Sequence, residues 1–440
     1  MQYYSLQKQS PNVDFRTAAV TGQAPDKGLY FPSEIPKFTA AQIENFKTLD
    51  KASLAYEVMR PYVGDTIDDA TLKNICAETI NFDFPLVPIT DTISSLELFH
   101  GPTLAFKDVG ARFMSRCLGY FSKKARADKS NTVLVATSGD TGGAVANGFL
   151  GVTGVNVIIL YPKGKVSPIQ ELQLTTLGQN ITALEVEGSF DDCQAIVKEA
   201  FMDAELNEAY NLTSANSINV ARWLPQQLYY FFAWQQWVAK YQDTEGNYPA
   251  MNIVVPSGNF GNICAGMIAK ASGLPLGHFV AACNANDVVT RYMATEKYEV
   301  KPSVLTLSNA MDVGNPSNFV RILEIMQNNF STLTDALTSY SITDADTKST
   351  IARVYKTNNY ILDPHGAVAF IAAEKFLTAT DARTVILETA HPVKFPEVVE
   401  EAIGQSLSIP ASVQNLFERE KVSIPLAPNY TAFKSWMLKK

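Results

Sequence analysis

One lysine lies in an unusually apolar stretch of the chain. The segment 98–108, with the sequence LFHGPTLAFKD, holds Lys107 among leucine, phenylalanine, glycine and proline residues. An ammonium group is costly to bury, so a lysine in such surroundings tends to lose its proton or to form a Schiff base. Either state is suited to covalent catalysis with an aldehyde cofactor. The alternative is a side chain that extends from a core segment to the surface, but three further motifs favour catalysis.

Two glycine-rich turns follow apolar, β-branched segments. One is TSGDTGGA at residues 137–144, and the other is PSGNFGNI at residues 256–263. Such a strand-to-helix turn exposes backbone N–H groups at the positive end of a helix dipole and binds anions readily. Neither turn has the Gly-Lys-Ser/Thr of a P-loop or the G-x-G-x-x-G of a dinucleotide site. Together with Lys107 they predict two anionic groups in one cleft, although tight packing is the alternative for either turn alone.

Two further polar clusters are expected near the same cleft. Residues 214–222, SANSINVAR, offer amide and hydroxyl donors followed by the guanidinium of Arg222, which can bind a phosphate or carboxylate through two hydrogen bonds. The alternative role is a cap on a long helix that begins near Arg222, and both roles can hold. Residues 387–395, LETAHPVKF, follow another apolar segment. With four histidines and no H-x-x-x-H spacing, metal catalysis is not indicated.

Short apolar segments predict the strands that position these motifs. The segments are continuous rather than alternating, which is typical of strands buried on both faces of a parallel sheet. They lie at residues 131–136, 155–160, 181–186, 251–255, 279–283 and 384–387. Helical segments between them, such as 191–204 and 222–241, predict an α/β fold whose cleft lies at the carboxyl ends of the strands. Residues 1 to about 90 differ, with turns and short amphipathic helices near 39–62 and 66–78.

Composition narrows the class of protein. The 440 residues are 46% hydrophobic and 18% charged, which is typical of globular proteins, and the net charge of −8 argues against a nucleic-acid partner. The five cysteines are dispersed without a C-x-x-C pair, so we expect neither zinc nor a disulfide framework but reduced thiols in a cytoplasmic protein. No apolar segment has the length of a bilayer span, and the N-terminus lacks the apolar core of a signal peptide, so no membrane partner is expected.

The four motifs in combination resemble a known family. The Lys107 segment, Ser138–Gly142, Ser257–Gly261 and Thr389–Pro392 are similar to those of threonine synthases of the longer class found in bacteria and fungi. The resemblance covers essentially the whole chain. It implies a fold-type II pyridoxal-phosphate enzyme, with two interleaved open parallel-sheet domains and an N-terminal subdomain. The expected boundaries are an N-terminal subdomain at 1–90, a large cofactor domain at 91–112 and 228–405, a small α/β domain at 113–227, and a C-terminal extension at 406–440.

The resemblance also implies roles for individual residues. Lys107 would carry pyridoxal 5'-phosphate, Thr389 would meet the pyridine nitrogen, and Asp140 would lie near the 3'-oxygen, where many superfamily members have asparagine. A carboxylate facing a phenolate is unfavourable unless a proton is shared. The cradle for the cofactor's phosphate would be Gly258, Asn259, Phe260, Gly261 and Asn262. The substrate's phosphate and carboxylate would be bound by Ser138, Thr141, Asn216, Ser217 and Arg222, and the sequence does not sort these donors between the two groups.

The implied reaction is O-phosphohomoserine plus water giving threonine plus phosphate. It requires several proton transfers, for which one lysine can serve alternately as base and acid. Two alternatives are a β-eliminating lyase or dehydratase acting on serine, threonine or a phosphorylated amino alcohol, and a non-catalytic sensor of an amino acid or phosphate metabolite. The Arg222 cluster together with Asp140 favours the synthase, and the presence of Lys107 and Thr389 argues against a sensor. The oligomeric state is left open by the sequence.

Overall fold

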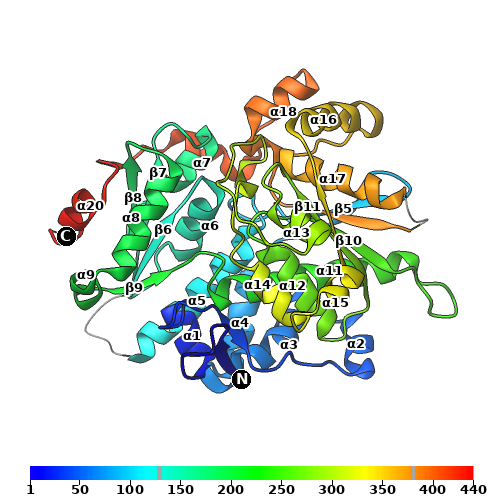
Figure 1. Cartoon of the computed structure of the whole chain (residues 1–440), viewed down its shortest axis with the longest axis horizontal. Coiled ribbons are helices and arrows are strands. Elements are labelled where there is room, and N and C mark those ends of the chain that lie inside the picture. The colour runs from blue at the N-terminus through cyan, green and yellow to red at the C-terminus, as the bar shows by residue number, and fades with distance from the viewer. Residues whose placement is uncertain (126–130, 379–381, 440) are drawn as a thin grey trace.

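Two parallel sheets form the framework of the chain and lie side by side in Figure 1. The computed structural model describes residues 1–125, 131–378 and 382–439. The first sheet has the strand order β12-β11-β10-β13-β5-β4 and is parallel except for its antiparallel edge strand β4. Its strands are β4 (Leu86–Pro88), β5 (Ile93–Glu97), β10 (Met251–Pro256), β11 (Leu276–Cys283), β12 (Leu337–Ser341) and β13 (Thr384–Glu388).

The second sheet has five parallel strands in the order β14-β8-β7-β6-β9. Its strands are β6 (Asn131–Ala136), β7 (Val155–Pro162), β8 (Ile181–Val186), β9 (Asn211–Ser214) and β14 (Ile424–Leu426). Strand β14 comes from the segment expected as a C-terminal extension and pairs with β8. The domain boundaries given above stay a prediction, but the C-terminal residues contribute directly to this sheet.

Helices cover both faces of each sheet. On the second sheet, α5 (Lys107–Ala125), α6 (Asp140–Phe149) and α7 (Pro168–Thr175) lie opposite α8 (Phe190–Met202), on which α20 (Tyr430–Met437) packs. On the first sheet, α17 (Pro364–Leu377) lies opposite α12 (Gly261–Ala271). The other helices are α9 (Ala204–Ala209), α10 (Val220–Trp223), α11 (Leu228–Tyr241), α13 (Val288–Thr295), α14 (Phe319–Ile325), α15 (Phe330–Ala336), α16 (Asp344–Asn358), α18 (Pro396–Ile403) and α19 (Ala411–Gln414). Short 3-10 turns are η1 (Gly64–Thr66), η2 (Leu224–Gln227), η3 (Asn309–Met311), η4 (Pro392–Lys394) and η5 (Asn415–Glu418).

The N-terminal residues run along one side of both sheets, coloured blue in Figure 1. A small antiparallel sheet is formed by β1 (Gln2–Ser5), β2 (Val13–Asp14) and β3 (Tyr30–Pro32). The helix α1 (Phe15–Thr21) lies between β2 and β3 in the chain, and the helices after β3 are α2 (Ala40–Phe46), α3 (Lys51–Val63) and α4 (Asp69–Thr79). The region near 39–62, predicted to be helical, contains the two helices α2 and α3. Asp50 separates them, because its side chain accepts hydrogen bonds from the first turn of α3 and caps it.

The six predicted strands are confirmed, two of them with the predicted bounds (131–136 and 181–186). Successive residues of β6 enter different cores: Val133 and Val135 face one core, and Leu134 faces the other. This burial on both faces explains why the strand is continuously apolar. The helix predicted to begin near Arg222 begins instead at Val220, where Asn219 is the cap, and a 3-10 turn interrupts it before α11. Over the three described ranges, no helix is long and apolar enough to span a membrane.

Candidate active site

Lys107 is the first residue of α5, directly after the loop that leaves β5. Its side chain is partly accessible, and the charged groups of Asp140, Lys394 and Arg222 surround it. The pKa of Lys107 is lowered to about 8, chiefly by burial; Asp140 opposes this shift, and the two cations contribute to it. A lysine with such a pKa is in part a neutral amine near physiological pH and can act as a nucleophile.

The loop that carries Lys107 pairs with the loop after β13. The Phe106 N–H donates to the Thr389 carbonyl at 2.9 Å, and the His391 N–H donates to the Leu104 carbonyl at 3.0 Å. Because β13 and β5 are neighbouring parallel strands, their carboxyl ends bring these loops together. Thr389 is buried, with 7% of its surface exposed. The structure thus brings Thr389 and Lys107, which are far apart in sequence, to one edge of the first sheet.

The turn from β10 to α12 has free backbone donors. Phe260 adopts a left-handed conformation with φ of 59°, and α12 begins at Gly261. Within the described residues, no hydrogen bond is made by the N–H groups of residues 258–262. The side-chain amide nitrogen of Asn262 is also buried without a partner. Free donors at the start of a helix are what an anionic phosphate requires.

The two glycines of this turn are needed for different reasons. A Cβ atom at Gly258 would lie 2.5 Å from the Cα atom of Met311, so the packing of the turn against η3 excludes any side chain there. A Cβ atom at Gly261 would meet Asn318 and Ser217 at 3.4–3.5 Å, which is ordinary contact. The fold therefore tolerates a small side chain at position 261, and only a ligand in the turn would exclude it.

The turn from β6 to α6 is built differently. The Thr137 hydroxyl accepts hydrogen bonds from the N–H groups of Gly139 (2.9 Å) and Gly142 (2.8 Å), so two of its backbone donors are already used. Asp140 is buried and receives hydrogen bonds from Lys394 at 2.7 Å and from the Gln170 side chain at 2.9 Å. Lys394 and Lys107 hold the pKa of Asp140 well below its usual range, despite its burial.

Ser138 and Thr141 present free hydroxyl groups beside Asp140. Both residues are partly accessible, and in the described part of the chain neither hydroxyl has a hydrogen-bond partner. They can donate to an anion without breaking an existing contact. In this turn the donors free to bind a ligand are therefore the two side-chain hydroxyls, whereas part of the backbone is already hydrogen-bonded.

The cluster 214–222 reaches both the 258–262 turn, through Ser217, and the surroundings of Lys107, through Arg222. The Ser217 hydroxyl accepts hydrogen bonds from Asn259 at 2.6 Å and from Asn318 at 3.3 Å, which joins it to the 258–262 turn. Arg222 is buried and donates one Nη–H to the Ala215 carbonyl, whereas its Nε–H has no partner among the described residues. Burial lowers the pKa of Arg222 to about 10, so it stays a cation at neutral pH. Its unused donor is suited to an anionic ligand.

Sequence reasoning missed three groups that support the site. Arg321 is fully buried, donates to the carbonyls of Tyr30 and Ile218, and lies 4.7 Å from the Trp223 ring, so it fixes the segment next to Ser217. Asn318 bridges Ser217 to the 258–262 turn. Lys394 lies between Val393 and Phe395, and the same argument from an apolar setting that singled out Lys107 would have found it.

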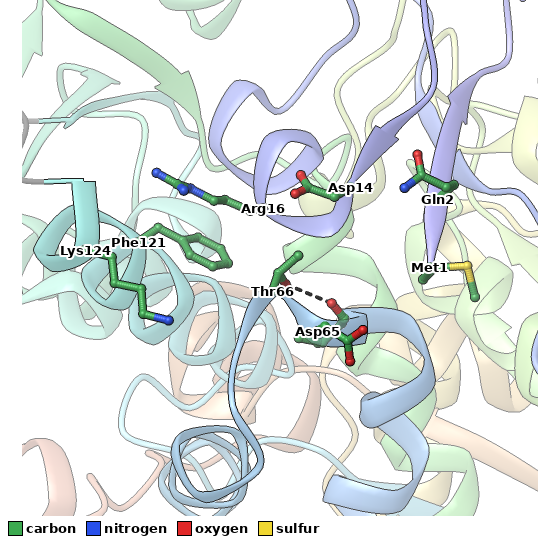
Figure 2. Close-up of a pocket in the computed structure, with 9 residues that line it drawn as sticks. Met1, Gln2, Asp14, Arg16, Asp65, Thr66, Phe121 and Lys124 are labelled. Atoms are coloured by element: carbon green, nitrogen blue, oxygen red, sulfur yellow. Dashed lines mark hydrogen bonds between the residues drawn. The ribbon is translucent and has the colours of Figure 1, made fainter.

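A separate surface hollow lies between the N-terminal strand and the end of α5, as Figure 2 shows. Its lining includes Asp14, Arg16, Phe121 and Lys124. None of the residues assigned to the active site lines it. The described residues also contain no group of three or more histidine, cysteine, aspartate or glutamate residues arranged to hold a metal ion.

Comparison with known proteins identifies the class of protein that has this site. The family of pyridoxal-phosphate-dependent enzymes matches residues 95–389, and the chain belongs to that family. Residues 2–80 match the threonine synthase N terminus, and residues 366–437 match the threonine synthase C-terminal family. Threonine synthase from Haemophilus influenzae is 40% identical over 439 residues, covering 100% of both chains. The chain thus belongs to the threonine synthases, which are pyridoxal-phosphate-dependent carbon–oxygen lyases acting on a small molecule.

Solved structures agree over the whole chain. The crystal structure of threonine synthase from Escherichia coli has a TM-score of 0.91 and 38% identity, with 100% of each chain covered. The structure of pyridoxal-phosphate-bound threonine synthase from Brucella melitensis has a TM-score of 0.92 and 35% identity, covering 99% of this chain and 98% of that one. The fold is therefore the fold-type II arrangement implied by the sequence motifs.

Proposed function

We propose that this chain converts O-phosphohomoserine and water into threonine and phosphate, with pyridoxal 5'-phosphate attached to Lys107. The observation that carries the proposal is that a lysine of lowered pKa has a buried arginine with an unused donor beside it. The free backbone donors of residues 258–262 lie at the end of strand β10, which is the neighbour of β13, the strand that leads to Thr389. These are two separate anion sites, as a phosphorylated cofactor and a phosphorylated substrate require.

The cofactor's phosphate is assigned to the 258–262 turn, and its pyridine nitrogen to Thr389. A threonine hydroxyl, unlike an aspartate, does not enforce a protonated ring. Asp140 is assigned to the neighbourhood of the 3'-oxygen, and the ion pair with Lys394 offsets the negative charge that would otherwise oppose that oxygen. When bound, pyridoxal phosphate withdraws electrons from the carbons next to the substrate's amino group.

Lys107 is assigned the proton transfers. Its pKa of about 8 lets it accept a proton from a substrate carbon and return it to a neighbouring one near physiological pH. Arg222 binds an anionic group of the substrate through its free Nε–H and holds it for loss of phosphate. The remaining donors for the substrate's phosphate and carboxylate are Ser138, Thr141, Asn216 and Ser217. The five buried cysteines, none of which forms a disulfide, support a cytoplasmic location for this reaction.

Product analysis tests the proposal. Purified protein incubated with O-phosphohomoserine should release phosphate and threonine in equal amounts. Phosphate without threonine, or ammonia from serine or threonine at a higher rate, would instead identify a lyase or dehydratase. Absence of both products together with absence of a visible absorbance band would leave only a sensor.

Borohydride reduction followed by peptide mapping tests the assignment of Lys107. The reduced cofactor should remain on the peptide that contains Lys107, and Lys107→Ala should abolish turnover because no other side chain replaces the amine. The variant should still bind some cofactor non-covalently through the 258–262 turn. Label on a different lysine would overturn the assignment.

A further inference from the structure

A second lysine is buried beside the first. The side chain of Lys394 is 0% exposed, and its ammonium lies 2.7 Å from the carboxylate of Asp140. It also donates a hydrogen bond of 2.8 Å to the Thr103 carbonyl. Asp140 itself is 4% exposed and belongs to α6, whereas Lys394 belongs to η4, which follows the Thr389 loop. The pair therefore joins two turns that both face Lys107.

Thr103 links this pair to the segment that carries Lys107. Its carbonyl accepts a second hydrogen bond, at 3.0 Å from the Gln173 side chain, and its N–H donates to Asp108 at 2.9 Å. Thr103 and Asp108 lie on either side of Lys107 in sequence. Lys394 thus anchors the loop whose shape determines where the Lys107 amine lies.

The charges around Lys107 come from three other elements. Asp140 of α6 attracts its ammonium form, whereas Lys394 of η4 and Arg222 of α10 repel it. His391 of the Thr389 loop is uncharged at neutral pH, because burial lowers its pKa to about 4. Asp108, which follows Lys107 on α5, accepts a hydrogen bond from the Thr103 N–H. Tyr229 of α11 donates its hydroxyl to the Phe106 carbonyl. Within the described ranges, Asp140 is therefore the one carboxylate that acts on Lys107 directly, and Lys394 shares it.

A buried ion pair is a poor way to stabilise a fold. Two apolar side chains of similar volume often stabilise a protein as well or better, since desolvation of both charges offsets their attraction. The pair is instead placed where its charges act on the reactive amine. This placement, together with the bond to Thr103, distinguishes Lys394 from a residue that only fills the core.

We propose that Lys394 is a positioning residue of the active site, which acts by engaging the Asp140 carboxylate and so leaves Lys107 available as a neutral amine. The proposal rests on the proposed function, because it takes Lys107 as the lysine that reacts with the cofactor. Lys394 acts through Asp140 and Thr103 and needs no contact with substrate. Removing each partner of the pair should therefore move the protonation of Lys107 in opposite directions.

The test titrates Lys107 in the cofactor-free full-length chain. Trinitrobenzenesulfonate labels neutral amines, and peptide mapping reads the rate at Lys107 as a function of pH, with a midpoint near 8 expected for the unchanged chain. Lys394→Met should raise this midpoint by about one unit, because Lys107 loses a repelling cation and gains the whole charge of Asp140. Asp140→Asn should lower it by a similar amount. The double variant should return towards the original midpoint.

Control variants separate this role from folding. Lys421→Met breaks a pair with Glu171 on the nearby helix α7 and should leave the midpoint unchanged. Lys394→Gln, which can still donate to Thr103, replaces Lys394→Met if that variant does not fold. Lower melting temperatures for both Lys394 and Asp140 variants with an unmoved midpoint would overturn the proposal. Failure of the unchanged chain to form threonine would overturn only the proposed function, because the labelling does not depend on turnover.

Discussion

The two glycine-rich turns of the site share a plan and differ in how their donors are used. Both join a parallel strand to the start of a helix, β6 to α6 and β10 to α12. In the first, the Thr137 hydroxyl accepts hydrogen bonds from two of the backbone N–H groups. The buried carboxylate of Asp140 lies in the first turn of the helix α6. In the second, the N–H groups of residues 258–262 have no partner within the described chain.

The difference shows that a helix start binds an external anion only where the chain itself leaves its donors free. A carboxylate near the start of a helix already interacts with the positive end of the helix dipole. The backbone of the β6–α6 turn is therefore less suited to binding a phosphate. Its free hydroxyls, Ser138 and Thr141, are better suited to a ligand that comes and goes. The second turn is better suited to a resident phosphate group. We therefore expect substitutions in the two turns to affect different quantities.

The largest effect is expected at Asp140. Asp140→Ala leaves the Lys394 ammonium buried without its partner, and such a loss costs about 3–5 kcal/mol of unfolding free energy. Urea denaturation measures it. As a matched control, Glu187→Ala removes the carboxylate of an exposed pair with Lys163 just after β8 and should change stability by about 1 kcal/mol or less. Equal effects of the two substitutions would show that the first turn does not depend on its buried charge.

The next effect concerns catalysis, at Arg222. Arg222→Ala removes a charge-assisted contact of about 1.5–3 kcal/mol, which predicts a loss of kcat/KM of at least about tenfold with the cofactor absorbance unchanged. Arg222→Lys should recover only part, because the fork of donors is lost. The competing interpretation is packing, since one Nη–H already bonds the Ala215 carbonyl. Packing alone predicts a lower melting temperature with near-normal turnover, so both quantities are measured on each variant.

The sequence predicted the elements that its local pattern determines. Strands 131–136 and 181–186 have the predicted bounds because burial on both faces makes every residue apolar. The strands β1 to β3 were missed because two to four residues are too short for a periodic pattern. Strand β5 was missed because Ser94 and Ser95 interrupt its apolar run, although both are buried. In both cases the local sequence lacks a clear apolar pattern, and the strand forms by pairing with strands elsewhere in the chain.

Some features of the candidate site are visible in the local sequence, and others depend on contacts that only the fold creates. The sequence singles out Lys107 and the two turns because the residue types there are physically unusual: a lysine in an apolar segment, and clustered glycines after a strand. The pairing of Asp140 with Lys394 was not, since it joins residues 254 positions apart, and only the fold brings them within 2.7 Å. Likewise, the sequence shows two similar glycine-rich turns. It does not show that the backbone N–H groups are hydrogen-bonded in the β6–α6 turn and free in the β10–α12 turn. Role assignments for the catalytic, cofactor-binding and substrate-binding residues therefore stay predictions.

A smaller effect separates the two glycines of the second turn. Gly258→Ala should cost about 1–3 kcal/mol of stability, because its Cβ atom would overlap the backbone of Met311. Gly261→Ala should leave the urea midpoint nearly unchanged, since its Cβ atom would make only ordinary contacts with Asn318 and Ser217, but should weaken cofactor binding. Equilibrium dialysis with pyridoxal phosphate measures the second quantity. Full cofactor affinity in Gly261→Ala would mean that the turn is a packing feature and not a cradle.

The smallest effect is expected at Asn259, whose side chain joins the second turn to Ser217 in the cluster 214–222. It donates to the Ser217 hydroxyl at 2.6 Å and accepts from the Ser317 N–H at 2.6 Å. Asn259→Ala removes these bonds, each worth about 1 kcal/mol, but leaves the backbone donors of the turn in place. We therefore expect KM for O-phosphohomoserine to rise about fivefold, while the Kd for pyridoxal phosphate stays within about twofold. The opposite result, a large loss of cofactor affinity with an unchanged KM, would mean that the side chain and not the backbone holds the phosphate.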